Sequence, residues 1–131
     1  MSTQSPTIQQ YMTPAPHVID AARPVEEAYQ LMKSAKIRHL PVVSKDRLVG
    51  LLSDRDLRLV MSFPDVNPDE VRVADAMRPS PFTVAPDSTL AEVAASMAEH
   101  KEDSAVVARN EKVLGIFTTV DACRALADLL P

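Results

Sequence analysis

The sequence is poor in glycine and cysteine, and each of these two shortages excludes a class of protein. The 131 residues include 2 glycines and 1 cysteine. Two isolated glycines cannot build a glycine-rich phosphate loop, a dinucleotide-binding fingerprint or the nucleophile elbow of a hydrolase. The single cysteine, Cys123, excludes an internal disulfide, and its place in a predicted helix is interpreted as packing. We therefore predict that the chain is not an enzyme.

Long apolar runs and an excess of basic charge are also missing. No run approaches the roughly 18 apolar residues of a membrane-spanning helix, and Met1–Pro6 lacks the basic-then-apolar pattern of a signal peptide. The net charge is −4 with both signs mixed, which argues against nucleic acid as the main partner. The three histidines have no metal-binding spacing, so we expect no metal site. A soluble cytoplasmic protein is the default expectation.

What the chain does contain is an internal repeat. Gly50–Asp56 reads glycine, two apolar residues, a hydroxyl residue, two variable residues and aspartate, and Gly115–Asp121 repeats that pattern. Adding 65 to a residue number in the first half gives its counterpart in the second half without a gap. Because repeats this short cannot bury their apolar faces alone, we expect the two halves to pack on each other.

The hydropathy pattern predicts an α/β (α+β) fold in which each half runs strand, helix, strand, strand, helix. The two β-α-β-β-α repeats, residues 8–61 and 73–130, are joined by a linker at 62–72 and related by a pseudo-two-fold axis. Pro24 suits the first position of a helix, and Ser88 can cap the corresponding helix. In the first half the expected elements are a strand at 17–19, a helix at 24–36, strands at 40–43 and 48–52, and a helix at 54–61. Those of the second half are a helix face at 90–97, strands at 104–108 and 113–117, and a helix at 120–130.

The repeated motif places chemistry at a helix N-terminus. Ser53 and Thr118 stand where an N-cap is expected, and Asp56 and Asp121 follow three residues later. This arrangement predicts a hydroxyl, a carboxylate and free backbone N–H groups at one point. Two interpretations stay open: the motifs are structural capping boxes, or they bind a ligand with adjacent hydroxyl groups.

Several stretches together carry a resemblance to a known family. They are Met12–Pro14, Ile37–Val43 and Gly50–Asp56, with Met77–Pro79 and Gly115–Asp121 in the second half. In this order, and twice, they resemble a tandem pair of CBS domains, which are named after cystathionine β-synthase and called a Bateman module. The resemblance covers about residues 8–130 and is to the small stand-alone bacterial type.

The resemblance implies a ligand and its site. Such modules bind adenosine compounds: AMP, ADP, ATP, S-adenosylmethionine or a dinucleotide such as NAD. A carboxylate, Asp56 or Asp121, would accept hydrogen bonds from the two ribose hydroxyls, and Ser53 or Thr118 with helix N–H groups would hold a phosphate. The resemblance places the adenine contacts at Val18, Ile19, Arg38 and His39 in the first half, and at Thr83, Val84, Asp103 and Ser104 in the second.

The two halves differ where phosphates would bind. Arg38 and His39 can be cationic, whereas their counterparts are Asp103 and Ser104. In CBS pairs these positions reach the ligand held by the other half. We therefore expect the Thr118–Asp121 cleft to favour AMP, ADP or ATP, and the Ser53–Asp56 cleft to take a less anionic adenosine compound or none.

The terminal helices of the halves predict assembly. Leu57, Val60 and Met61 give the first an apolar side, and Leu126, Leu129 and Leu130 do so for the second. Because CBS pairs dimerise through such helices, we expect a homodimer with a symmetric contact that acts on an unknown regulated protein. The alternative is a scaffold without ligand that only dimerises or docks a partner.

Overall fold

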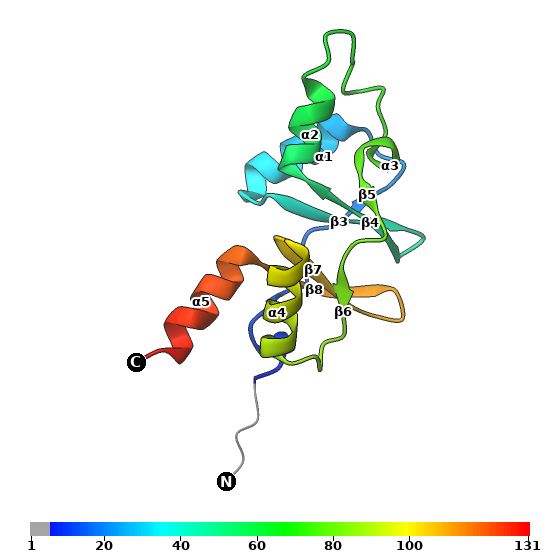
Figure 1. Cartoon of the computed structure of the whole chain (residues 1–131). Helices are drawn as coiled ribbons and strands as arrows, with labels where there is room; N and C mark the ends of the chain where they lie inside the picture. The colour runs from blue at the N-terminus through cyan, green and yellow to red at the C-terminus, as the bar shows by residue number, and fades with distance from the viewer. Residues whose placement is uncertain (1–5) are drawn as a thin grey trace. The chain divides into compact units, whose positions relative to one another are not determined.

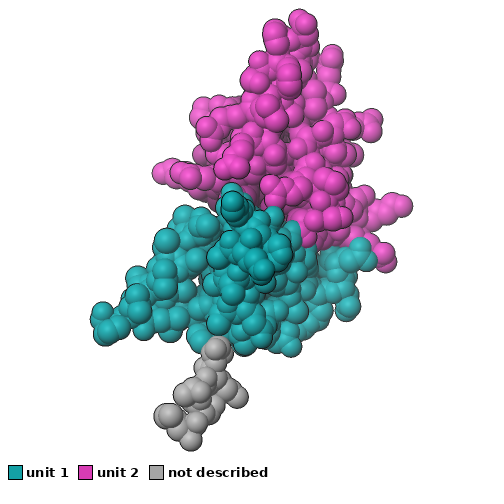
Figure 2. All heavy atoms as spheres, in the orientation of Figure 1, with its two compact units in different colours: residues 1–16, 82–131 teal, residues 17–81 magenta. Residues whose placement is uncertain are grey.

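The computed structural model describes residues 6–131 in two compact units. Unit 1 combines the N-terminal segment up to Pro16 with Phe82–Pro131, and unit 2 is His17–Pro81 (Figure 2). Residues 1–5, on which most of the signal-peptide expectation falls, lie outside the described residues.

Unit 2 is a four-stranded sheet with helices (Figure 1). The strand order is β2-β3-β4-β5, with β2 parallel to β3 and the other pairs antiparallel. The N-terminal elements are β2 (Ile19–Asp20), α1 (Val25–Ala35), β3 (His39–Ser44) and β4 (Arg47–Ser53). They are followed by α2 (Asp54–Met61), α3 (Val73–Ala76) and β5 (Arg78–Pro79).

Unit 1 has the same plan. Its strand order is β1-β8-β7-β6, with β6 parallel to β7 and the other pairs antiparallel. The segment before Pro16 supplies the 3₁₀ helix η1 (Ile8–Gln10) and β1 (Thr13–Pro14). The rest of the unit supplies β6 (Thr83–Val84), α4 (Leu90–His100), β7 (Ser104–Arg109), β8 (Lys112–Thr118) and α5 (Thr119–Leu129).

The backbone repeats at the spacing of the sequence. The bounds of α4, β7 and β8 are those of α1, β3 and β4 moved by 65 residues, and the bulge at Val42/Val43 recurs at Val107/Ala108. Lys45 and Asp46, like Asn110 and Glu111, have positive φ, which matches the tight hairpin turn that suits twisted strands. The predicted order of strand, helix, strand, strand, helix in each half is confirmed.

Each sheet takes its edge strand from the segment that precedes the other repeat. β1 pairs with β8, and β5 pairs with β4. The exchanged strands pass directly over the two glycines: a Cβ on Gly115 would lie 2.3 Å from Met12 Sδ, and one on Gly50 would lie 2.4 Å from Met77 Sδ. Neither glycine has a positive φ. Glycine is therefore needed at these positions for close approach and not for backbone freedom.

Each unit has its own apolar core between sheet and helices. In unit 2 it includes Leu40, Val42 and Leu52, and in unit 1 Val107 and Phe117. Leu57 was expected on an exposed apolar side but is only 2% exposed and belongs to the first core. Its place one helical turn after the N-cap points it inward onto the sheet.

Several sequence-based boundaries were wrong by a residue or more. Pro24 is the N-cap of α1 and not its first residue. Thr89, not Ser88, caps α4, because its side chain accepts a hydrogen bond from Glu92 N. The strand expected at 17–19 is β2, Ile19–Asp20. The short helix α3 was not predicted.

Candidate ligand site

The repeated hydroxyl and carboxylate lie at the junction of a strand and a helix in each unit. Ser53 ends β4 and caps α2: its Oγ accepts from Asp56 N at 3.1 Å, while Asp56 Oδ2 accepts from Ser53 N at 3.1 Å. Thr118 and Asp121 make the same reciprocal pair at α5, at 3.4 and 3.0 Å. Both motifs are capping boxes, so the structural interpretation is confirmed for each.

Fewer N–H groups are free at these helix ends than the sequence predicts, because two of the first three of each helix are hydrogen-bonded. The amide of Asp54 donates to the carbonyl of Arg38 at 2.9 Å, and that of Thr119 donates to the carbonyl of Asp103 at 3.2 Å. The capping hydroxyl takes the amide three residues after it. A phosphate at either helix end would therefore depend on side chains more than on the backbone.

Asp121 is buried and already bonded within unit 1. It is 4% exposed. Besides the cap, it accepts from Thr13 Oγ at 3.3 and 3.5 Å, and Arg124 lies 3.3 Å from its Oδ1. A ribose at this carboxylate would have to replace or join the contacts of Thr13 and Arg124.

Asp56 has a more open setting. It is half-buried, and Ser53 is its hydrogen-bond partner among the described residues. The positions that correspond to Thr13 and Arg124 hold Arg78 and Leu59, so no hydroxyl and no helix arginine occupy the equivalent places. The two carboxylates are thus alike in sequence motif and different in surroundings.

The remaining predicted site residues lie near these motifs within each unit. In unit 2, His39 pairs with Ser53 across β3 and β4; in unit 1, Ser104 pairs with Thr118 across β7 and β8. Ser104 is buried, whereas Arg38 and Asp103 are exposed. Ile19 lies on β2, with Val18 just before it, and β6 is Thr83 and Val84. Strand pairing therefore brings His39 beside Ser53 and Ser104 beside Thr118.

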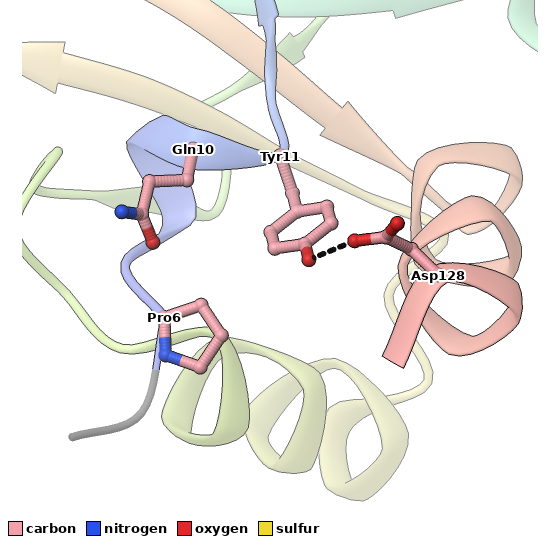
Figure 3. A pocket seen from close by; sticks show the side chains of 4 residues that line it. All are labelled: Pro6, Gln10, Tyr11 and Asp128. Atoms are coloured by element: carbon pink, nitrogen blue, oxygen red, sulfur yellow. Dashed lines mark hydrogen bonds between the residues drawn. The ribbon is translucent and has the colours of Figure 1, made fainter. Parts of the chain in front are cut away.

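A polar pocket of about 440 Å³ in unit 1 was not predicted (Figure 3). It is lined by Pro6, Gln10, Tyr11 and Asp128. The Tyr11 hydroxyl donates to Asp128 Oδ2 at 2.5 Å, which fastens the segment after η1 to the C-terminal half of α5. No spacing in the sequence links residues so far apart in the chain.

The Asp128 carboxylate raises the pKa of Tyr11 above 10.0 through their hydrogen bond. Because the folded pKa exceeds the unfolded one, the stabilisation by this bond is complete below pH 10 and is lost as pH rises through the folded pKa. We expect Asp128→Asn to lower the pH at which Tyr11 ionises, measured by tyrosinate absorbance. Tyr11→Phe identifies its signal among the 2 tyrosines, and an unchanged midpoint in Asp128→Asn would contradict the contact.

Two kinds of feature are absent from residues 6–131. Within this range no group of three or more His, Cys, Asp or Glu side chains is placed to hold a metal ion. None of the helices in the same range is long and apolar enough to cross a membrane.

Comparison with known proteins decides the family. The model of the CBS domain matches residues 8–62 and again residues 73–128. The chain belongs to the CBS domain family. The two matches fall on the two repeats, so the chain is a CBS pair, and the resemblance noted in the sequence is confirmed.

Individual proteins resemble the chain over most of its length. The protein YlbB of Bacillus subtilis is 36% identical over 99 residues, 74% of this chain and 66% of YlbB. The crystal structure of AcuB from Vibrio cholerae has a TM-score of 0.87 and 28% identity, covering 97% of this chain and 94% of AcuB. CBSX2, determined in complex with AMP, has a TM-score of 0.82 and 28% identity, with 96% and 99% covered.

Some curated relatives are longer proteins. The chain spans 66% of YlbB and 19% of an inosine-5'-monophosphate dehydrogenase of Korarchaeum cryptofilum, to which it is 34% identical. The match to the dehydrogenase covers 98 residues, so the activity of the whole dehydrogenase is no evidence for an activity of this chain.

Proposed function

We propose that this CBS pair is a non-catalytic regulatory module that binds an adenosine-containing ligand. AMP, ADP or ATP is favoured, with S-adenosylmethionine or NAD as alternatives. The observation that carries the proposal is the paired hydroxyl and carboxylate at the start of α2 and of α5. The AMP complex of CBSX2, 28% identical over nearly the whole chain, supports the choice of ligand class.

Each group has an assigned role. The carboxylates of Asp56 and Asp121 would accept hydrogen bonds from the ribose hydroxyls, and the hydroxyls of Ser53 and Thr118 would contact the phosphate. The adenine would lie against Val18, Ile19, Arg38 and His39 in one half, and against Thr83, Val84, Asp103 and Ser104 in the other. The prediction stays that the more anionic ligand binds at Thr118 and Asp121. Arg38 and His39 would supply the cationic side chains for its phosphates.

The proposal also covers the compartment, the oligomeric state and the regulatory role of the module. A cytoplasmic homodimer would sense the adenylate level and pass the change to a regulated protein. The ligand acts by favouring one conformation, and the shift cannot exceed its difference in affinity for the two conformations.

Thermal unfolding with AMP, ATP, S-adenosylmethionine and NAD tests ligand binding. At 100 times the dissociation constant a ligand should add about 2.7 kcal/mol to the free energy of unfolding. If none of the four raises the unfolding temperature, the proposal fails, and the alternative of a dimerising or docking scaffold is favoured.

Alanine variants of the two aspartates test which carboxylate binds the ligand more tightly. Isothermal titration of ATP should show a larger loss of affinity in Asp121→Ala than in Asp56→Ala. Asp121→Asn and Asp56→Asn are matched controls, because an amide oxygen can still accept the capping hydrogen bond while the charge is lost. Equal losses of ATP affinity in both alanine variants would contradict the predicted difference between the two sites but not the proposal of adenosine binding.

A further inference from the structure

The polar pocket of unit 1 is built from residues that the adenosine proposal does not use. Its lining is Pro6, Gln10, Tyr11 and Asp128, around a volume of about 440 Å³. Figure 3 shows the Tyr11 ring between Pro6 and Gln10 on one side and Asp128 on the other. The pocket is therefore a separate candidate site.

Both walls of the pocket are fixed by the core of unit 1. Tyr11 packs against this core, and Ile8 of η1 is fully buried in it. The amide of Leu90 donates to the carbonyl of Pro6 at 2.7 Å, and Ala125 holds α5 in the same core. Because the walls are anchored before a ligand arrives, little affinity is lost in ordering them.

The pocket contains a carboxylate without a cationic partner in residues 6–131. Asp128 Oδ2 accepts the hydroxyl of Tyr11, and no basic side chain in that range pairs with this aspartate. Helix α5 contains one basic residue, Arg124, which lies 3.3 Å from Asp121 instead. Because the last turn of α5 has no basic residue, the negative end of the helix dipole adds to the charge of Asp128. The pocket therefore favours a cation.

The lining also provides hydrogen-bond acceptors and an aromatic ring. Besides Asp128, the Tyr11 hydroxyl oxygen can accept while its hydrogen is donated. The side-chain oxygen of Gln10 accepts from Thr7 N at 3.0 Å and has a second lone pair. An ammonium group donates three hydrogen bonds and is attracted to an aromatic ring. The Pro6 ring adds an apolar contact for an alkyl chain.

The lining distinguishes ammonium from other cations. A guanidinium binds best across both oxygens of a carboxylate, and Tyr11 already bonds one oxygen of Asp128. A divalent metal ion takes about six or more oxygen ligands, whereas the lining has a single carboxylate. A primary ammonium is a compact point charge that needs neither arrangement.

The side chains that give the pocket its chemistry have no equivalents in the other repeat. At the spacing of 65 residues, Tyr11 corresponds to Ala76 and Asp128 to Phe63. Alanine and phenylalanine supply neither a hydroxyl nor a charge. The chemistry of the pocket therefore does not follow from the repeated fold and belongs to this half of the chain.

We propose that this pocket binds a small molecule that carries a primary ammonium group on a short alkyl chain. The ammonium donates to the Asp128 carboxylate and to the Tyr11 hydroxyl oxygen, and the chain lies against Tyr11 and Pro6. This ligand is distinct from the adenosine compound, and the binding of one does not require the other.

An NMR titration with three matched probes tests the chemical class. The probes are n-butylamine, n-butylguanidine and 1-butanol, and at pH 7 the amine is protonated as a lysine side chain is. The signals are those of the Gln10 side-chain amide and the Tyr11 ring. We expect saturable shifts with n-butylamine, at least about tenfold tighter binding than 1-butanol, and weaker binding of n-butylguanidine than of n-butylamine.

Variants test the assigned residues. Asp128→Asn should weaken n-butylamine binding at least about tenfold, because the hydrogen bond to a charged group is lost. Tyr11→Phe keeps the ring and should weaken binding less, with the Gln10 amide as its signal. Glu99→Gln removes the same charge at an exposed position of α4 and is the matched control, which should leave the affinity unchanged. Circular dichroism checks that each variant is folded.

Four results would overturn the inference. They are no saturable shift with n-butylamine, equal affinity for 1-butanol, binding of n-butylguanidine as tight as that of n-butylamine, or equal losses in Asp128→Asn and Glu99→Gln. Thermal unfolding with AMP keeps this inference apart from the adenosine proposal. If AMP raises the unfolding temperature while n-butylamine does not bind, only the inference about the pocket fails.

Discussion

Replacing Phe117 by alanine is expected to lower the free energy of unfolding by about 3–5 kcal/mol. Phe117 is fully buried in the core of unit 1, in one cluster with Ile8 and Val107. Truncation removes the contacts of the ring and leaves a cavity that strands cannot close. Because domains are stable by only about 5–15 kcal/mol, this loss should be plain in urea denaturation followed by circular dichroism.

Phe63→Ala is the matched control for this prediction. Phe63 follows α2 and is 56% exposed, so the same chemical change should alter the free energy of unfolding by no more than about 0.5 kcal/mol. Similar losses in the two variants would mean that the core of unit 1 is not centred on Phe117.

Replacing Gly50 by alanine is expected to cost about 1–3 kcal/mol, and more than the same change at Gly115. At Gly50 the new Cβ would meet Met77 Sδ at 2.4 Å and the backbone oxygen of Arg78 at 2.9 Å. The three nearest atoms at Gly115 all belong to the side chain of Met12. A methionine can change rotamer, whereas a paired strand must shift as a whole.

Double-mutant cycles separate the clash with a methionine side chain from the clash with the strand backbone. Met12→Ala should offset most of the loss in Gly115→Ala, because it removes the three atoms nearest to the new Cβ. Met77→Ala should offset only part of the loss in Gly50→Ala, since the Arg78 oxygen stays in place. The measurement is the free energy of unfolding of each single and double variant. Equal coupling energies at the two sites would show that the strand backbone is not the obstacle.

Elements with a regular apolar spacing were predicted from the sequence, whereas the edge strands β1 and β5 were missed. Helices such as α1 and hairpins such as β3–β4 follow from apolar spacing and polar turns. Strands β1 and β5 have two residues each, too few for an alternating pattern. Their pairing with the sheet of the other repeat runs through backbone groups, which leave no trace in side-chain order.

The residues of the candidate site could be predicted from the sequence, but their tertiary contacts could not. The repeat identified Ser53, Asp56, Thr118 and Asp121, and all four lie at helix starts as expected. The hydrogen bond from Thr13 to the buried Asp121 depends on a strand from the far end of the chain. Such a contact, like that of Tyr11 with Asp128, is set by tertiary structure.

The exchanged edge strands limit what one repeat can do by itself. A single repeat of about 65 residues would lack the edge strand that β1 or β5 supplies to the sheet of the other repeat. Expressed alone, it could complete its sheet only by exchanging that strand with a second identical copy.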